Sequence, residues 1–227
     1  MWRGIPRLDA QAAADPAVRV VIVCGAAGNF ASGADIAEFP RVFADEEAAL
    51  AYGSLIETAT AALANLEKPV IARIDGYCIG AGLAIALACD LRIAARGARL
   101  GAPPARLGLI YSLSDTRRLV DAVGASAAKA MLFTAALLTA DEALRLGLVD
   151  ETHDAKDLTG AVEDKARAIA ALSSNSIRRA KALVSMVSRG QLEETDETRR
   201  WFAEAATGVD FAEGLAAFTA RRPPVFP

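Results

Sequence analysis

Two short loops of small residues are the part of the sequence best suited to chemistry. They read FASGAD, residues 30–35, and CIGAG, residues 78–82, and each follows an apolar run that predicts a strand. Ligands of open α/β proteins bind beyond the carboxyl ends of strands, and glycine lets the backbone approach a ligand closely. Two such loops side by side would direct two backbone N–H groups at one oxygen, as in an oxyanion hole. The alternative is that both loops are tight turns whose glycines only let a strand and a helix pack closely.

Other catalytic arrangements fit the sequence poorly. The only histidine, His153, lies among acidic residues in LVDETHD and is expected to be a solvated loop residue, so a Ser–His–Asp triad is not expected. The segment FASGA is not a G-x-S-x-G nucleophile elbow, and GAGLAI does not follow the first strand as a dinucleotide site requires. Because no metal-ligand spacing occurs either, we expect neither a metal nor a bound cofactor.

Composition and charge limit the class of protein. The chain has 227 residues, 53% of them hydrophobic, but no stretch reaches the roughly 18 uncharged apolar residues of a membrane span. A net charge of −3 and scattered basic pairs argue against nucleic-acid binding. Cys24, Cys78 and Cys89 lie in apolar segments, which predicts buried thiols in a reducing compartment. No signal peptide is recognisable, so a cytoplasmic location is the expectation.

The elements that would position the two loops follow from the apolar pattern. Strands are predicted at residues 18–25, 69–75 and 90–95, and the first is expected to be buried on both faces and therefore parallel. Helices are predicted at 45–67, where Pro69 follows, and at 81–88, directly after the second glycine loop. A further helix is predicted before the first strand, whereas residues 98–109 have no regular pattern.

Helices dominate the second half of the chain. The predicted segments cover residues 114–123, 126–133 and 140–146, with several more between 155 and 220. Strands that alternate with helices early, followed by helices alone, indicate an α/β layer structure with a helical C-terminal region. We therefore divide the chain into an α/β core, residues 1–165, and a C-terminal helical region, residues 166–227.

Five segments, in order along nearly the whole chain, resemble the crotonase (enoyl-CoA hydratase/isomerase) superfamily. The first two contain the glycine loops, and the last two match the family's F-T-G-x-x-x-x-A-x-E-A-x-x-x-G-L-V and D-x-x-E-G-x-x-A-F-x-x-K-R-x-P-x-F patterns. The segments are NFASGADIAEF, KPVIARIDGYCIGAGLAIALACDLRIAA, RLGAPPARLGLIYSLSDTRRLVDAVG, MLFTAALLTADEALRLGLVDE and DFAEGLAAFTARRPPVF. One such match is moderately specific, and five in the family's order are a strong signal.

The resemblance implies a spiral of ββα units, a helical C-terminal trimerisation region and an acyl-CoA thioester as ligand. Two backbone N–H groups would hold the thioester oxygen and stabilise an enolate, and by position these belong to Ala34 and Ala81. The matching positions that would contact substrate or CoA are Ser32, Gly33, Asp35, Ile36, Gly80, Pro103, Arg106, Phe218 and Arg221. Phe218 and Arg221 would come from the tail of a neighbouring subunit, in a homotrimer or a dimer of trimers.

The sequence departs from the family where hydratases carry their two glutamates. One glutamate gives a proton while the other takes one. The first position holds Ala84, three residues beyond the second N–H donor, and the second, in GAPPA, holds Pro104. Since neither side chain transfers protons, ordinary two-glutamate hydration is not expected.

Three residues are candidates to replace the missing carboxylates or to bind a polar acyl group. Asp115 is either a relocated acid/base or a helix N-terminal residue favoured by the dipole. Tyr111 is either a hydrogen-bond donor to a developing charge or an aromatic of the channel wall. Arg106 either faces the acyl pocket, where it would bind an acidic acyl group, or lies on the surface.

Two functions remain open on the sequence alone. The first is an enzyme on acyl-CoA thioesters that isomerises, decarboxylates or hydrolyses its substrate. The second is a non-catalytic acyl-CoA-binding protein that keeps the fold without the chemistry. Family members usually carry an N-terminal strand pair and a CoA-contacting loop before the helix with which this chain begins, so about 30 residues are expected to be missing relative to them.

Overall fold

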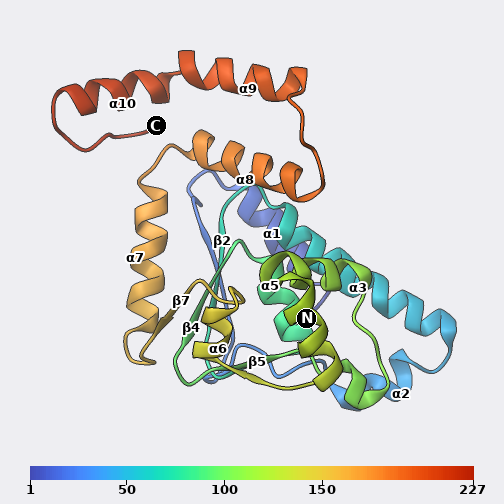
Figure 1. The fold of residues 1–227 in the computed structure, drawn as a ribbon. Helices are drawn as coiled ribbons and strands as arrows, with labels where there is room; N and C mark the ends of the chain where they lie inside the picture. Colours follow the sequence, from blue (N-terminus) through green and yellow to red (C-terminus); the bar gives the residue numbers. More distant parts are fainter.

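The computed structural model describes all residues 1–227, and its centre consists of two small β-sheets (Figure 1). The first sheet is parallel throughout and has the strand order β1 (Val21–Cys24), β2 (Val70–Ile74), β4 (Leu91–Ala95), β7 (Glu151–His153). In the second sheet β3 is parallel to β5 and β6 is antiparallel to it, in the order β3 (Tyr77–Ile79), β5 (Arg99–Gly101), β6 (Leu138–Thr139).

The chain winds through these sheets as a spiral of ββα units. Strand β2 enters the first sheet, β3 enters the second, and helix α4 (Ala81–Ala88) follows. Strands β4 and β5 repeat this path and are followed by helix α5 (Leu113–Thr134). The loop after β1 also joins the second sheet, because Ala31 forms a parallel bridge with Cys78. The ββα spiral expected from the resemblance is therefore present.

Helices cover both faces of the first sheet. Ile71 and Ile93 of the sheet pack against Leu158 and Val162 of helix α7 (Leu158–Ala170) on one face. The opposite face contributes to a larger core with helices α3 to α5 and the second sheet. The remaining segments before α7 are α1 (Ile5–Ala14), η1 (Ile36–Glu38), α2 (Phe39–Val42), α3 (Glu46–Asn65), η2 (Pro104–Leu107) and α6 (Ala140–Arg145).

Local sequence explains where several of these elements begin and end. Asp45 caps α3 by accepting a hydrogen bond from the N–H of Ala48, and Thr139 and Glu142 form a capping box at α6. The break predicted between two helices at residues 123–126 is confirmed as a kink at Gly124, where φ is +75°. Since a positive φ suits glycine, the kink lies at the residue that tolerates it best.

Four short strands and two burial predictions differ from the sequence expectation. The region 98–109 contains β5 and η2 rather than irregular chain, and β3, β6 and β7 were not predicted. His153 is not a solvated loop residue, because it lies on β7 and pairs with Ala95 of β4. Strand β1 lies at the edge of the sheet and is only half buried, and Cys24 is exposed, so the expected burial of both is wrong. Cys78 and Cys89 are buried, as predicted.

The C-terminal helices extend beyond the sheets. Helix α8 (Ser174–Ser188) lies across one end of the core, and α9 (Asp196–Thr207) and α10 (Val209–Thr219) lie outside it, with the C-terminus returning along α10 (Figure 1). The boundary predicted at residues 165 and 166 falls within α7, so the helices that leave the sheet begin with α8. No helix of the protein has both the length and the apolar character to span a membrane.

Candidate functional site

The two glycine loops lie side by side, as an oxyanion hole requires. The N–H of Ala31 donates to the carbonyl of Tyr77 and the N–H of Ile79 donates to the carbonyl of Ala31, both at 2.9 Å. Gly82 makes this approach possible, because a Cβ at that position would lie 2.5 Å from the carbonyl oxygen of Ala31. Glycine at position 82 therefore has a packing role that joins the two loops.

Gly80 makes the turn from β3 into α4. Its φ of +56° and ψ of −114° are unfavourable for residues with a side chain. The N–H of Gly80 donates to the carbonyl of Gly101 at 2.9 Å, and its carbonyl accepts from the N–H of Ala84 at 3.0 Å. Helix α4 thus starts at Ala81, with the N–H groups of its first turn directed out of the helix end.

The N–H groups of Ala34 and Ala81 are free to bind a ligand. Neither donates a hydrogen bond within the chain, and neither residue has a positive φ. Ala34 follows Gly33, whose φ is +121°, and Ala81 follows Gly80. Both alanines line one cavity of about 450 Å³, so the two loops bring the predicted donors to a common space.

The cavity is lined mainly by apolar side chains. Phe39, Phe43 and Tyr52 form one wall, with edge-to-face ring pairs at 5.0 and 5.5 Å. The other lining residues include the predicted Ser32, Gly33, Ile36, Gly80, Pro103, Tyr111 and Asp115, with Ala49, Gly53, Ile56, Leu107, Leu109, Ile110 and Ser112. A pocket of this size and composition suits an apolar acyl group.

Ala84 and Pro104, which the resemblance assigns to the two glutamate positions of a hydratase, line the same cavity. Ala84 is on the first turn of α4 and only 2% exposed, and Pro104 begins η2. Neither side chain can donate or accept a proton.

Asp115 is the only carboxylate that lines the cavity, and its oxygens are already engaged. One oxygen lies 3.1 Å from Nη1 of Arg118, and the other accepts a hydrogen bond from Oγ of Ser112 at 2.8 Å. Arg118 also donates to Oγ1 of Thr60 at 3.1 Å, and Ser112 caps α5 by accepting from the N–H of Asp115. Both oxygens of Asp115 therefore have partners within the chain, and this geometry favours a structural role.

The hydroxyl of Tyr111 donates a hydrogen bond to the glycine turn at Gly80. Its hydroxyl lies 2.6 Å from the carbonyl oxygen of Gly80, although the two residues are 31 positions apart. Burial, with the negative charge of Asp115 nearby, holds the pKa of Tyr111 well above its usual value. The phenol is therefore a neutral donor that is already paired with the backbone.

Four predicted site residues do not line this cavity. Asp35 caps η1 by accepting from the N–H of Ala37 at 3.0 Å. Arg106 is exposed on η2 and does not line the cavity, which fits the surface alternative rather than contact with the acyl pocket. Phe218 is 84% exposed on α10 and Arg221 follows that helix with a φ of +51°. The sequence had assigned these last two to a neighbouring subunit's site.

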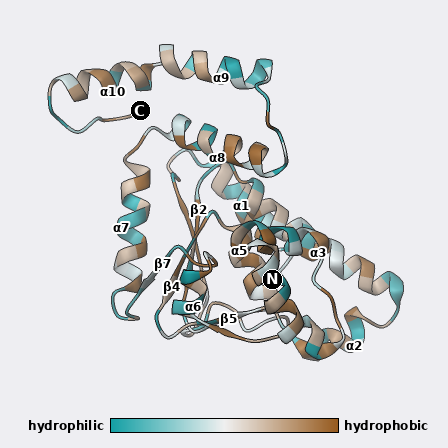
Figure 2. Cartoon of the chain, viewed as in Figure 1, coloured by the Kyte–Doolittle hydropathy of each residue, from teal (hydrophilic) through white to brown (hydrophobic).

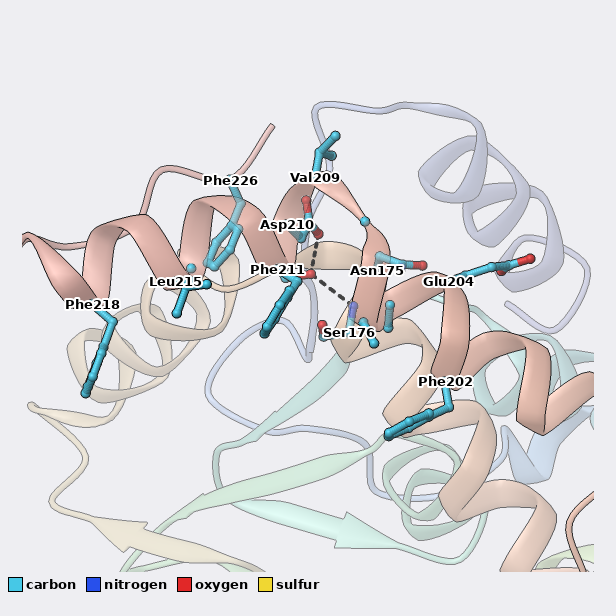
Figure 3. A pocket seen from close by; sticks show the side chains of 15 residues that line it. Asn175, Ser176, Phe202, Glu204, Val209, Asp210, Phe211, Leu215, Phe218 and Phe226 are labelled. Atoms are coloured by element: carbon cyan, nitrogen blue, oxygen red, sulfur yellow. Dashed lines mark hydrogen bonds between the residues drawn. The ribbon is translucent and has the colours of Figure 1, made fainter.

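A second cavity, of about 840 Å³, lies between α8, α9 and α10 (Figure 3). Phe202, Phe211, Leu215, Phe218 and Phe226 line it, and Asp210 accepts a hydrogen bond from Ser173 at its inner side. Helix α10 is largely hydrophobic in Figure 2, although four of its large apolar residues are more than half exposed.

Sequence reasoning missed the aromatic wall and the partners of Asp115 and Tyr111. Phe39 and Phe43 precede the helix predicted at residues 45–67 and Tyr52 lies within it, so no single local pattern grouped the three rings. The pairing of Arg118 with Asp115 at a spacing of three residues is a helical ion-pair pattern that could have been recognised.

The comparisons with known proteins agree with this architecture. The sequence model described as "Enoyl-CoA hydratase/isomerase" matches residues 10–227. A crotonyl-CoA hydratase of Syntrophomonas wolfei is 36% identical over 215 residues, which cover 92% of this chain and 80% of that protein.

Two solved structures have closely similar folds. An enoyl-CoA hydratase/isomerase family protein of Hyphomonas neptunium has a TM-score of 0.97 and 43% identity, with all of this chain and 87% of that chain covered. An enoyl-CoA hydratase/carnithine racemase of Magnetospirillum magneticum has a TM-score of 0.96 and 32% identity, with coverages of 100% and 85%. Since both sequence and fold agree over nearly the whole length, the chain belongs to the enoyl-CoA hydratase/isomerase family.

Proposed function

We propose that the protein binds an acyl-CoA thioester with its carbonyl oxygen between the N–H groups of Ala34 and Ala81. The observation that carries this proposal is that both N–H groups are unpaired and both residues line the same apolar cavity. Donors fixed at this position stabilise negative charge that develops on the oxygen, either in an enolate or in a tetrahedral intermediate. The thioester's CoA is part of the substrate, and no further cofactor is required.

Decarboxylation of a carboxyacyl-CoA is the reaction that requires the fewest catalytic side chains. The bond between the α-carbon and the carboxylate breaks, CO₂ leaves, and the electron pair forms an enolate whose oxygen is held by the two N–H groups. Water then supplies a proton to the α-carbon. No protein base is needed, which fits a cavity with Ala84 and Pro104 at the hydratase positions and with Asp115 engaged by Arg118. Isomerisation and thioester hydrolysis use the same N–H donors but need a proton carrier, for which Asp115 is the only carboxylate in the cavity.

The second candidate is a non-catalytic acyl-CoA-binding protein. Its support is that Asp115 and Tyr111 are already paired, Asp115 with Arg118 and Tyr111 with the carbonyl of Gly80. A protein of this kind would bind the thioester through the same N–H groups and release it unchanged.

The proposal includes an oligomeric assembly and a reducing compartment. The exposed apolar face of α10 and the Phe218 side chain fit a homotrimer or a dimer of trimers, in which Phe218 and Arg221 reach the CoA bound by a neighbour. The free thiols of Cys24, Cys78 and Cys89 fit a reducing compartment such as the cytoplasm.

A binding and product screen separates the candidates. The purified protein is incubated with enoyl-, carboxyacyl- and aryl-CoA esters, products are followed by mass spectrometry, and binding is measured by calorimetry with free CoA as control. We expect tighter binding of acyl-CoA than of free CoA, and release of CO₂ from a carboxyacyl-CoA. Binding without turnover across the panel would support the non-catalytic candidate, whereas equal affinity for CoA and acyl-CoA would contradict both.

A further inference from the structure

The carbonyl group of Gly80 accepts two hydrogen bonds from different parts of the chain. One comes from the N–H of Ala84 at 3.0 Å and belongs to the first turn of α4. The other comes from the hydroxyl of Tyr111 at 2.6 Å, and Tyr111 lies just before α5. The helix requires only the first bond, so the contact from Tyr111 needs a separate explanation.

The carbonyl of Gly80 and the N–H of Ala81 belong to the same peptide unit. A trans peptide is planar, so its C=O and N–H point in opposite directions and turn together. No peptide bond of this chain is cis. A hydrogen bond that fixes the direction of the Gly80 carbonyl therefore also fixes the direction of the Ala81 N–H.

The turn needs such support because glycine does not fix its own conformation. Gly80 has the widest backbone freedom of any residue type, and a Cβ at this position would meet nothing within 4 Å. The bond from its N–H to the carbonyl of Gly101 holds the side of the turn toward β5. Tyr111 holds the opposite side, at the peptide that carries the oxyanion donor.

A hydrogen bond to the carbonyl oxygen also makes the N–H of the same peptide a stronger hydrogen-bond donor. Hydrogen bonds in a chain polarise one another, by about 10–30% per bond in condensed-phase estimates. The Tyr111 ring packs against the main core, and burial keeps its hydroxyl protonated by raising its pKa. The phenol thus remains a donor to Gly80 throughout the ordinary pH range.

We propose that Tyr111 is a positioning residue that orients and polarises the Ala81 N–H through the carbonyl of Gly80. The inference rests on the proposed function, because it concerns the N–H that would hold the thioester oxygen. Tyr111 acts from behind the peptide and does not itself touch that oxygen.

The test measures the carbonyl stretch of bound butyryl-CoA, labelled with ¹³C at the thioester carbon, by isotope-edited infrared spectroscopy. This ester has no double bond and no acyl carboxylate. The variant is Tyr111→Phe, which removes only the hydroxyl. The matched control is Tyr77→Phe, since Tyr77 lies on β3 outside the cavity and its hydroxyl makes no hydrogen bond. The same variants are assayed for turnover of any ester that the wild type converts.

We expect binding to shift the wild-type carbonyl stretch to lower frequency. In Tyr111→Phe this shift should be smaller by about 10–30% or more. Tyr77→Phe leaves the shift unchanged. For a converted ester, kcat falls about three- to tenfold with KM nearly constant, less than the 10²–10³-fold effect of deleting an oxyanion donor. A residue that only packed the core would change stability and not the carbonyl frequency of the folded complex.

An unchanged shift in folded Tyr111→Phe overturns the inference while leaving the proposed function intact. No shift in the wild type contradicts the proposed function itself. If Tyr111→Phe does not fold, 3-fluorotyrosine at position 111 serves instead, because it is a stronger donor of nearly the same shape. It is expected to increase the shift relative to wild type, and a shift equal to or smaller than the wild-type value would overturn the inference.

Discussion

The carbonyl oxygen of Ala31 lies only 2.5 Å from the place that a Cβ on Gly82 would occupy. Because Gly82 has no side chain, the loop that contains Ala34 lies close to the helix that begins at Ala81, and the two proposed oxyanion donors come together. Any side chain at position 82 would push the two loops apart. The proposed site thus depends on the absence of a single methyl group.

Gly82→Ala is expected to destabilise the protein and weaken acyl-CoA binding. The added methyl overlaps backbone on the neighbouring loop, and overpacking of this kind costs about 1–3 kcal/mol. The control is Gly160→Ala in α7, where a Cβ meets nothing within 4 Å. That change should stabilise the protein by about 0.4–1 kcal/mol through the unfolded state. Denaturant unfolding and calorimetric titration measure both effects, and a neutral Gly82→Ala would show that the loops can separate freely.

The double variant Ala84→Glu and Pro104→Glu is expected to gain hydration of crotonyl-CoA. Both residues line the cavity with the N–H donors, so the change would place two carboxylates where one can give and the other take a proton. Hydration is followed by the loss of enoyl absorbance, with each single variant as control. Rapid hydration by the wild type would contradict the account, since Ala84 and Pro104 carry no proton.

Asp115→Asn is expected to reduce stability more than activity. The Asp115 side chain is buried against Arg118, and removing the charge of one partner in a buried pair costs up to about 3–5 kcal/mol. The amide still accepts a hydrogen bond from Ser112, so part of that cost is avoided. Thermal unfolding and turnover per folded molecule are compared. A large loss of turnover with full stability and unchanged binding would identify Asp115 as the acid/base instead.

Asp9→Asn is expected to raise the melting temperature near pH 7. One carboxyl oxygen of Asp9 is buried and has no hydrogen-bond partner, and burial raises the pKa of this group, partly offset by Lys181. A raised pKa in the folded state means that the native protein holds its proton longer than the unfolded chain. Wild-type stability therefore falls as the pH rises from about 4, the ordinary aspartate value, through the raised pKa.

The difference between Asp9→Asn and wild type should accordingly shrink in acid. Below about pH 3.5, where Asp9 is protonated in both states, the two melting temperatures are expected to converge. Melting curves recorded from pH 3 to pH 8 measure this. A difference that is constant across the whole range would show that the charge of Asp9 is not its cause.

The sequence predicted the elements whose signal is local. Helix α4 begins and ends at the predicted residues Ala81 and Ala88, because Gly80 marks the change from strand to helix. Strands β3 and β5 escaped prediction because each has three residues and is defined by pairing with the other. Cys24 was expected to be buried because its segment is apolar, but burial depends on which elements cover β1.

The site was predictable only in part for the same reason. Ala34 and Ala81 could be assigned from motif positions, and both line the cavity. The bond from Tyr111 to Gly80 joins residues 31 positions apart, and no local pattern encodes it. For Arg106 the sequence left two alternatives open, the acyl pocket or the surface, and the structure shows it exposed on η2, a single short turn.

Removal of one of the two proposed donors tests whether these backbone N–H groups hold the thioester oxygen. Ala81→Pro deletes the N–H at the first position of α4, where proline is well tolerated in helices. The measurement is the infrared shift of the ¹³C-labelled thioester carbonyl of bound butyryl-CoA in the wild type and in this variant, with folding checked by circular dichroism. We predict a clear shift to lower frequency in the wild type and loss of about half of it in folded Ala81→Pro, because one of two donors remains. The same shift in both proteins would contradict the assignment of the Ala81 N–H to the thioester oxygen.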